Sequence, residues 1–447
     1  MVKEKDIPRN DDQYEQLASE YIIQGNELLD EIAVNAHKLY DSVLYIIRQG
    51  FCGKTKNAQT HYSYAQLNSI FKKRYQNRQS MLYHGLGYVQ SAQQTIKEVC
   101  TIWDAWFKAL KAYKVNPQKF TGKPRIPNYP KTSKKHTFYI ANQNAKIKDG
   151  FLVISKLNIK LKLKPGIKKI GRVALKPLAR SRYKVIVPVK QEKEIKYLPD
   201  NGIYVGVDPG VDNAFVCATN ANKRPLIING HGLKSVNQYY NKRIAYLKSK
   251  QAEYHQLEFF INTKHGKQPC YYRTQRMIKC DEYRNNKVYQ FAHKASKRIV
   301  DYALSCGANT IVIGKNKNWK RHSNMGKRNN QNFIGIPHAM MINMIRYKAN
   351  QYGISVIAIN ESYTSQTSFL DHEKPCYDNG NKARERKGLS PAVRRIKRGL
   401  FKSNNGTLIN SDVNGALQII KKAFPNSSFD DGIEGVVLHP VKWSPLI

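Results

Sequence analysis

The chain has 447 residues, and its 75 lysines and arginines far outnumber its 32 aspartates and glutamates, which gives a formal net charge of +43. Hydrophobic residues make up 41% of the sequence, which excludes a disordered basic tail, and the length predicts about two to four domains. A folded chain with this excess of positive charge repels itself unless a polyanion neutralises it. The composition therefore predicts a protein that binds nucleic acid over a long surface.

The sequence shows no apolar segment of about 18 residues and no secretory leader, so we expect a protein of the prokaryotic cytosol or nucleoid that makes no membrane contact. Its seven cysteines include no CxxC pair. Neither a disulfide framework nor a zinc site is therefore expected.

The first part of the chain, residues 1–120, has a helical pattern. Apolar residues recur at helical spacing from Leu28 to Ile47 and again from Met81 to Leu110. We predict a helical recognition region here, with a basic face suited to nucleic acid and no β-strand in the first 30 residues.

The next part, residues 121–199, differs in composition and in hydrophobic pattern. Its start is rich in proline and lysine and predicts a loop, whereas apolar and polar residues alternate with period two from His136 to Pro199. Residues 156–163, Lys-Leu-Asn-Ile-Lys-Leu-Lys-Leu, place apolar side chains on one face and lysines on the other. We interpret this region as a small β-barrel or curled sheet that contacts RNA or a nucleic-acid backbone.

From Ile203 onward the pattern is α/β. Three strands come first, at 202–210, 214–220 and 225–230, followed by a long helical stretch at 235–305 that is broken near 265–269. A strand at 308–315, a helix at 338–352, a strand at 354–361 and a last helix at 411–424 complete the order. This order is that of an RNase H-like fold, in which the first and fourth strands are neighbours and the fifth lies beside the fourth. The fold class expected for the whole chain is multi-domain α+β.

Carboxylates stand at the ends of these elements. Asp208 ends the first strand, Glu361 ends the last, and Asp412 begins the final helix. Hard Mg²⁺ ions prefer carboxylate oxygens, and such a cluster can hold two ions about 3.5–4 Å apart that activate water and stabilise the leaving oxygen of a phosphodiester. These positions predict a site for phosphodiester hydrolysis.

Two motifs resemble a known family. Residues 206–213, GVDPGVDN, and 411–416, SDVNGA, resemble the first and third RuvC motifs of TnpB, the RNA-guided nuclease of insertion sequences, and of the related compact type V CRISPR effectors. Residues 363–367, YTSQT, match as well. The resemblance covers most of 80–425 and is specific from 203 onward. It implies an Mg²⁺-dependent, RNA-guided DNA endonuclease with Asp208 and Asp412 as metal ligands.

The sequence departs from the family pattern at one ligand. The second family motif usually ends its strand with a glutamate, but here the fourth strand ends at Gly314 and Lys315. Neighbouring strands lie about 4.8 Å apart, so Glu361 can reach across the space left by Gly314. We predict that Glu361 is the relocated third ligand, as in part of the family. The alternative is a solvated Glu361 in an inactive nuclease.

A second departure concerns zinc. The family usually carries two CxxC pairs before the last motif, whereas residues 368–405 hold one cysteine and many basic residues. The predicted phosphate contacts in this insert are Arg394, Arg395, Lys397 and Arg398, with Arg384 and Arg386 as weaker candidates. After the fourth strand, Lys315, Trp319 and Lys320 are candidates for contact with nucleic acid. A solvated insert and a buried Trp319 are the alternatives.

The resemblance implies a division of labour. We expect a helical recognition region at 1–120, a β-barrel wedge region at 121–199 and the first part of a RuvC-like nuclease at 200–367. A basic insert without zinc ligands follows at 368–405, then the last RuvC-like helix at 406–425 and a tail at 426–447. A guide RNA and a target double-stranded DNA are the expected partners of a monomeric chain. The alternatives are a compact type V CRISPR effector, a nuclease-dead RNA-guided repressor, and an RNase H-like transposase. No DNA-binding helical motif that would mark a transposase is visible.

Overall fold

The computed structural model of the chain describes residues 17–53, 62–120, 122–129, 134–189, 195–254, 257–263, 266–271, 273–315, 326–362, 364–373, 394–397 and 399–446. Its contacts divide the chain into an N-terminal unit, Gln16–Glu192, and a C-terminal unit that includes Lys193–Ile447. The finer division into six regions stays a prediction. No helix in these ranges is long and apolar enough to cross a membrane.

The helices of the N-terminal unit begin at clear capping signals. The Asn26 side chain accepts a hydrogen bond of 2.9 Å from the Leu29 amide, and Ser63 and Gln66 form a capping box. The second long helix begins later than the apolar pattern suggests, because Gly87 adopts a positive φ of 74° just before it. The elements are α1 (Glu27–Phe51), α2 (Tyr64–Gln76), α3 (Val89–Val115) and the 3₁₀ helices Pro117–Lys119 and Ser155–Leu157.

The prediction that the first 30 residues hold no strand is wrong. Strand β1 (Leu17–Gln24) pairs antiparallel with β7 (Arg182–Val189) along its full length. Its signal in the sequence is weak because β1 is an edge strand with one buried face: Ser19 is buried, whereas Ile22 on the other face is 60% exposed.

The alternating region 136–199 does form strands, but they lie in two open sheets. One sheet has the order β1-β7-β6-β2, with all neighbours antiparallel, and the other has the order β3-β4-β5. No hydrogen-bonded ladder joins these sheets or closes either of them within the described ranges, so the expected closed barrel is not found. The further strands are β2 (Phe138–Ile140), β3 (Lys146–Lys148), β4 (Phe151–Ile154), β5 (Ile159–Lys162) and β6 (Val173–Leu178).

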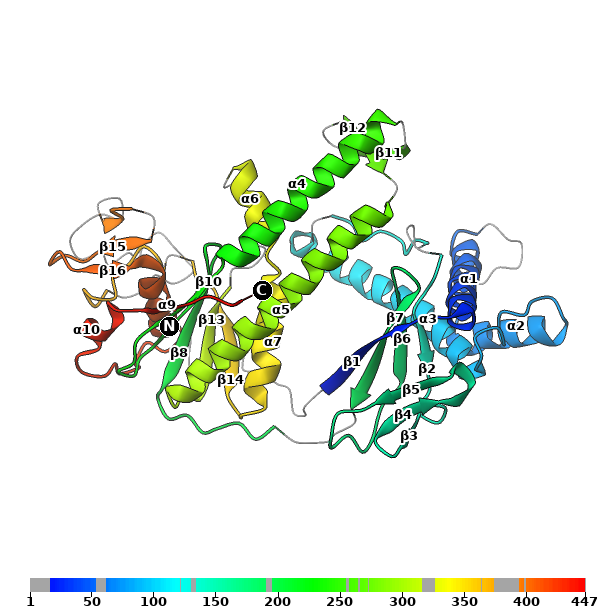
Figure 1. Ribbon diagram of the computed structural model, residues 1–447, viewed down its shortest axis with the longest axis horizontal. Coiled ribbons are helices and arrows are strands. Elements are labelled where there is room, and N and C mark those ends of the chain that lie inside the picture. The colour runs from blue at the N-terminus through cyan, green and yellow to red at the C-terminus, as the bar shows by residue number, and fades with distance from the viewer. Residues whose placement is uncertain are drawn as a thin grey trace. The chain divides into compact units, whose positions relative to one another are not determined.

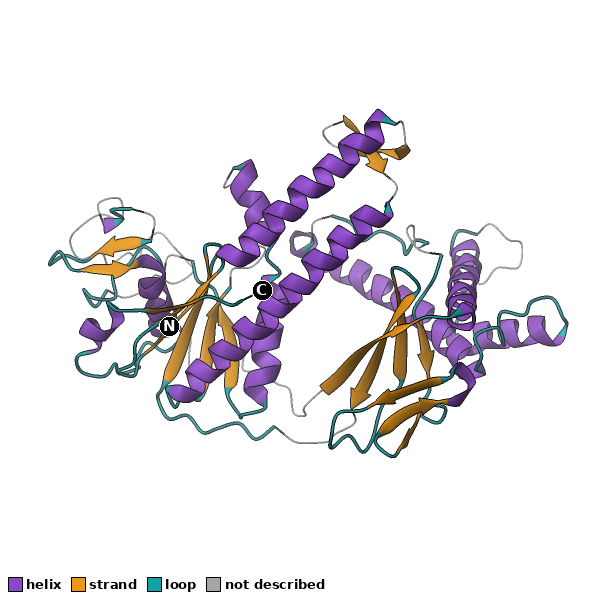
Figure 2. Cartoon of the chain, in the orientation of Figure 1, coloured by secondary structure: helices purple, strands orange, loops and turns teal. Residues whose placement is uncertain are grey.

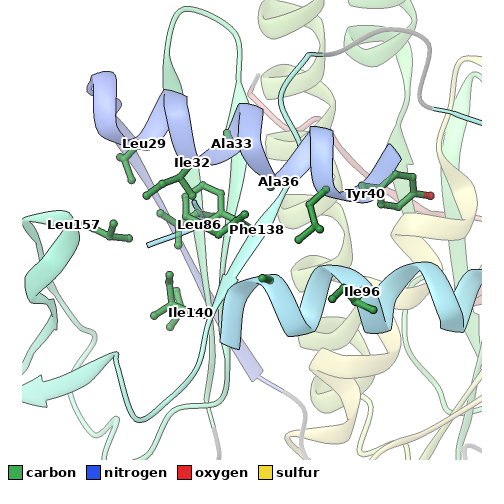
Figure 3. Packing of buried hydrophobic residues seen from close by; sticks show 14 of the residues in the cluster. Leu29, Ile32, Ala33, Ala36, Tyr40, Leu86, Ile96, Phe138, Ile140 and Leu157 are labelled. Carbon is green, nitrogen blue, oxygen red and sulfur yellow. The ribbon is translucent and has the colours of Figure 1, made fainter. Parts of the chain in front are cut away.

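Helices and sheets of the N-terminal unit share one hydrophobic core. Figure 3 shows Ile32 and Ala36 of α1 and Ile96 of α3 close to Phe138 and Ile140 of β2. The Tyr183 hydroxyl donates to the Leu29 carbonyl at 2.9 Å, which fastens β7 to α1. The helical and β regions therefore form one packed body.

The C-terminal unit is built on a six-stranded mixed sheet of order β14-β13-β8-β9-β10-β17 (Figure 1). Strand β13 runs parallel to both β8 and β14, while β9 is antiparallel to β8 and β10. The predicted neighbours are therefore confirmed: the first strand lies beside the fourth, and the fourth beside the fifth. The bounds are β8 (Tyr204–Pro209), β9 (Asn213–Thr219), β10 (Leu226–Asn229), β13 (Thr310–Gly314), β14 (Ser355–Ile359) and β17 (Val441–Trp443).

Helices cover both faces of this sheet. Figure 2 shows two long helices, α4 (His231–Glu253) and α5 (Gln275–Ser305), and a hairpin of β11 (Leu257–Thr263) and β12 (Gly266–Tyr271) interrupts the predicted helical stretch between them. Helices α5 and α7 pack on one face, and α9 packs on the other. The remaining elements are α6 (Lys327–Ile334), α7 (His338–Asn350), α9 (Ser411–Ala423), α10 (Ile433–Val437), β15 (Leu400–Lys402) and β16 (Leu408–Asn410).

The packing of α9 on β8 depends on a glycine. A Cβ atom at Gly206 would overlap the Ala416 carbonyl oxygen and would lie 2.9 Å from a side-chain carbon of Ile420. The backbone of α9 can therefore lie directly on β8, which brings the start of the helix to the carboxyl end of the strand.

We expect Gly206→Ala to lower the free energy of unfolding of the C-terminal unit by about 1–3 kcal/mol, because α9 must move away from β8. Urea unfolding of the purified protein measures this. Gly435→Ala is the matched control, since nothing lies within 4 Å of the place where its methyl group would stand. Equal stability of the two variants would contradict the close packing.

Candidate functional site

The carboxyl ends of β8, β13 and β14 meet at one edge of the sheet. Asp208 is the last but one residue of β8, Gly314 ends β13, and Glu361 follows β14 by two residues. The three strands run parallel, with Val207 opposite Ile313 and Gly314 opposite Ile359. The topology therefore brings Asp208 and Glu361 to the same edge from two strands separated by one.

The Glu361 side chain occupies the space above Gly314. A Cβ atom at position 314 would lie 2.5 Å from Glu361 Oε2 and 3.0 Å from Glu361 Cβ. Any residue other than glycine would displace this carboxyl group. The absence of a side chain at Gly314, the last residue of β13, is thus what allows Glu361 from the next strand to reach toward β8.

Asp412 comes to the same edge on the first turn of α9. The Asn410 side chain caps this helix by accepting from the Asp412 amide at 3.0 Å and the Val413 amide at 3.2 Å. Asn213 Nδ2 donates to Asp412 Oδ2 at 2.8 Å. A Cβ atom at Gly415 would lie 2.8 Å from Asp208 Oδ2, so α9 lies close against the Asp208 carboxyl.

The charges of Glu361 and Asp412 act on Asp208. Burial, and then the charges of Glu361 and Asp412, raise the pKa of Asp208 well above its ordinary value, while Arg395 opposes this shift. Burial raises the pKa of Glu361 to about 7, against the opposing charge of Lys422. Asp208 is therefore at the electrostatic centre of the group, where the nearby positive charges do not offset burial and mutual repulsion.

This donor set fits a hard divalent cation. The three carboxylates come from three elements that meet at this edge, and a cation beside Asp208 would offset the charges of Glu361 and Asp412 that act on it. As the side chains stand, no three histidine, cysteine, aspartate or glutamate side chains in the described ranges enclose a single position. Asp208, Glu361 and Asp412 are the residues that could hold Mg²⁺.

The loop after Glu361 is fastened to α9. Asn414 Nδ2 donates to the Thr367 carbonyl at 2.8 Å, and the Asn414 side-chain oxygen accepts from the Phe369 amide at 2.8 Å. Lys422 Nζ donates to the Ser362 carbonyl at 3.0 Å. Asn414 therefore connects this loop to the helix, a role that its position two residues after Asp412 did not reveal.

Asn213 and Lys422 are neighbours of the carboxylates that are not among the predicted site residues. Asn213 is the last residue of the GVDPGVDN motif, so the sequence could have indicated its place beside the site. No motif contains Lys422, whose proximity to Glu361 arises from packing. Asp212, in the turn between β8 and β9, forms an ion pair with Lys234 at 2.7 Å.

The structure describes four of the residues predicted to contact nucleic acid. Lys315, Arg395 and Lys397 are exposed, and the charge of Arg395 acts on Asp208. Trp319, Lys320, Arg384, Arg386 and Arg398 lie outside the described residues.

The prediction for Arg394, the fourth of these residues, is wrong. The sequence predicts a phosphate contact, but the Arg394 side chain is 1% exposed and forms an ion pair of 2.9 Å with Glu373. A guanidinium enclosed in this way faces carboxylates of its own chain and has no access to a phosphate.

Two family models match segments of the chain. The model OrfB_IS605, described as "Probable transposase", matches residues 186–320, and the model of a Cas12f1-like TNB domain matches residues 338–419. Asp208, Glu361 and Asp412 all fall within these segments. The resemblance to TnpB and to compact type V effectors that the motifs indicated is thereby confirmed, and the TNB match includes the insert that lacks paired cysteines.

Solved structures show looser likenesses. A Cas12f1–sgRNA–target DNA complex is 16% identical, with 88% of this chain and 82% of that chain covered and a TM-score of 0.48. A CRISPR–Cas12f ternary complex is 16% identical, with 90% and 82% covered and a TM-score of 0.35. CasPhi-2 (Cas12j) bound to crRNA is 7% identical, with 92% and 99% covered and a TM-score of 0.39. No curated protein sequence matches the chain.

We expect Mg²⁺ to stabilise the protein through the three carboxylates. For a dissociation constant of about 1 mM, about 10 mM Mg²⁺ adds about 1.4 kcal/mol to the free energy of unfolding. Glu361→Gln and Asp412→Asn should reduce this gain, which thermal unfolding with and without Mg²⁺ measures.

Asp212→Asn serves as the control for that measurement. It removes a neighbouring carboxylate that is already paired with Lys234, so the gain from Mg²⁺ should persist. An equal gain in all four proteins would show that Mg²⁺ binds elsewhere.

Proposed function

We propose that this chain is a TnpB-like, RNA-guided DNA endonuclease that hydrolyses DNA phosphodiesters with Mg²⁺ at Asp208, Glu361 and Asp412. The observation that supports this most is the meeting of three carboxylates at one sheet edge, in a chain whose net charge is +43. Acidic residues are scarce in this chain, and a group of three beside a strongly basic background suits metal ligands that face a phosphate.

The residues around the site have separable tasks. Asp208, on whose carboxyl the charges of the other two act, would hold Mg²⁺ together with Glu361 and Asp412. When bound, Mg²⁺ would supply the Lewis acidity that activates water and stabilises the leaving oxygen. Asn213 holds one oxygen of Asp412 by a hydrogen bond and so orients the other.

The expected partners are a guide RNA and a target double-stranded DNA, bound by one copy of the chain. The exposed Lys315, Arg395 and Lys397 lie on the C-terminal unit and are suited to phosphates near the site. The N-terminal unit, with its lysine-bearing strands, would hold RNA and the heteroduplex, whose base pairs supply the sequence specificity.

Two versions of this function differ in the origin of the guide RNA. The match to a Cas12f1-like TNB domain suits a compact CRISPR effector, whereas the OrfB_IS605 match suits a nuclease of an insertion sequence. Sequencing the RNA that co-purifies with the protein distinguishes them. RNA transcribed beside the gene supports TnpB, and RNA from a repeat array supports a CRISPR effector.

We expect Asp208→Ala and Glu361→Ala to lower the rate of target-DNA cleavage by more than about 100-fold, since each removes a charged group from the reacting centre. Single-turnover cleavage of plasmid DNA by the ribonucleoprotein in Mg²⁺ measures this. Asp431→Ala removes an exposed carboxylate of the same unit and should leave the rate unchanged. Full activity of the Glu361→Ala protein would contradict the role of Glu361 as a metal ligand.

A rescue variant tests the position of the relocated ligand directly. The Glu361→Ala protein lacks the carboxyl oxygen that would lie 2.5 Å from a Cβ atom at position 314, and the closest remaining neighbour is the end of the Ile419 side chain at 2.7 Å, which can shift. Gly314→Glu then returns a carboxylate to this edge from the adjacent strand. We expect the double variant to cleave at least about tenfold faster than Glu361→Ala. In the native background Gly314→Glu crowds Glu361 and should slow cleavage.

A further inference from the structure

A cavity lies at the opposite end of the six-stranded sheet from the three carboxylates. Residues 220–225 connect β9 to β10 at that end, because β9 runs antiparallel to β8 and returns the chain to where β8 begins. The last turn of α5 lies there too, since α5 ends at Ser305 shortly before Thr310, the first residue of β13, pairs with Tyr204 of β8. The cavity has a volume of about 530 Å³ and lies within the C-terminal unit. It is therefore separate from the candidate metal site.

Apolar side chains form one wall of this cavity. Leu226 of β10 is 2% exposed and Tyr302 of α5 is 8% exposed, while Val436 of α10 and Val441 of β17 are more accessible. Leu226 lies opposite Val441 in the parallel pairing of β10 with β17. The Tyr302 hydroxyl donates to the Arg224 carbonyl at 3.1 Å, so the polar end of this ring already has a partner. The wall therefore offers a ligand mainly apolar contact.

Three positive side chains, those of Lys223, Arg224 and Arg298, line the same cavity. Lys223 Nζ donates to the Ser305 carbonyl, and Arg224 Nε donates to the His439 carbonyl at 2.7 Å. The bond to His439 holds the Arg224 guanidinium in place, and within the described ranges its two Nη groups donate to no other residue. A guanidinium held in this way can bind an anion without first being ordered.

The positive charge at the cavity is not cancelled by its one carboxylate. Asp301 also lines the cavity, but Lys297 Nζ lies 2.9 Å from Asp301 Oδ1 and offsets that charge. Arg298 is exposed and forms no ion pair with any other described residue. Arg298 and Tyr302 are four residues apart on α5 and so lie on one face of the helix, which places a free positive charge beside the apolar wall.

We propose that this cavity binds a nucleoside 5′-monophosphate group, with its base against Leu226, Tyr302 and Val441 and its phosphate at Arg224 and Arg298. The volume falls within the range of about 300–1,000 Å³ that is usual for small-ligand sites, and a flat ring suits the apolar wall. A phosphate monoester carries a charge of about −2 and can meet several cations, whereas a carboxylate carries half of that charge. The ligand is either a free nucleotide or the 5′-phosphorylated end of an RNA, since both present this chemistry.

Calorimetric titration of the full-length protein, freed of bound RNA and kept without divalent cations, tests the proposal. The probes are the four ribonucleoside 5′-monophosphates. We expect at least one to bind with a dissociation constant of about 10–500 µM. Inorganic phosphate and the matching nucleoside should each bind at least about tenfold more weakly, because each offers only one of the two kinds of contact.

Two variants remove the two kinds of contact separately. Arg298→Glu reverses a charge at the cavity, and Val441→Trp fills the cavity without removing a charge; each should weaken nucleotide binding by at least about tenfold. Lys442→Ala is the matched control, because Lys442 follows Val441 on β17 and its exposed side chain points to the other face of the sheet. It should bind the nucleotide as the native protein does. Thermal unfolding shows whether each variant is folded.

A short RNA distinguishes the two sources of the ligand. If a tetranucleotide with a 5′-phosphate binds at least about tenfold more tightly than the same RNA with a 5′-hydroxyl, and Arg298→Glu removes that difference, the ligand is an RNA end. Equal binding of the two RNAs, together with tight binding of a mononucleotide, makes the ligand a free nucleotide.

Two results would overturn the proposal. One is that no mononucleotide and no 5′-phosphorylated RNA binds in preference to its phosphate-free form. The other is that a folded Arg298→Glu or Val441→Trp protein binds as tightly as the native protein does. Cleavage of DNA has no part in these measurements, so the nucleotide site and the proposed nuclease can each fail while the other stands.

Discussion

The close packing of α9 on β8 is the contact on which the candidate site depends. Gly206 lets the helix backbone rest on the strand, and Gly415 lets the first turn of the helix lie against the Asp208 carboxyl. A methyl group at either glycine would separate Asp412 from Asp208 by pushing the helix outward. The positions of Asp208 and Asp412 relative to each other thus depend on two glycines, since proteins are packed too densely to absorb an extra carbon atom there.

A third glycine makes room for the remaining carboxylate in the same way. Gly314 has no side chain, and Glu361 from the next strand lies in the space that one would fill. Burial, and then the charges of Glu361 and Asp412, raise the pKa of Asp208 and so disfavour its charged form. Such an arrangement persists because the surrounding fold holds it, through the Asn410 cap and the two hydrogen bonds of Asn414. Titratable groups with raised pKa values that are held in place by a packed frame are typical of functional sites.

Much of the fold could be predicted because its signals are local. Helical spacing marked α1 and α9, period-two alternation marked the strands of 136–189, and the order of elements was enough to predict that β8 lies beside β13. Strand β1 was missed because an edge strand with one buried face has a weak pattern, and the expected barrel proved to be two open sheets because closure depends on pairings between distant segments. The motif residues Asp208 and Asp412 were visible, whereas the burial of Arg394 was not, since nothing in a run of basic residues shows which one will meet Glu373.

The sequence by itself determined the side chains available to this protein: a strongly basic chain, a few acids at the ends of strands and helices, a glycine at the end of the fourth strand of the α/β region, and an insert without paired cysteines. Tertiary structure alone decided which of these groups meet. It brought Glu361 across Gly314, set α9 against Asp208, and turned Arg394 inward while Arg395 faces outward. The reason is physical: the identity of a side chain is local, but its neighbours, its burial and hence its charge state arise from contacts between residues far apart in the chain.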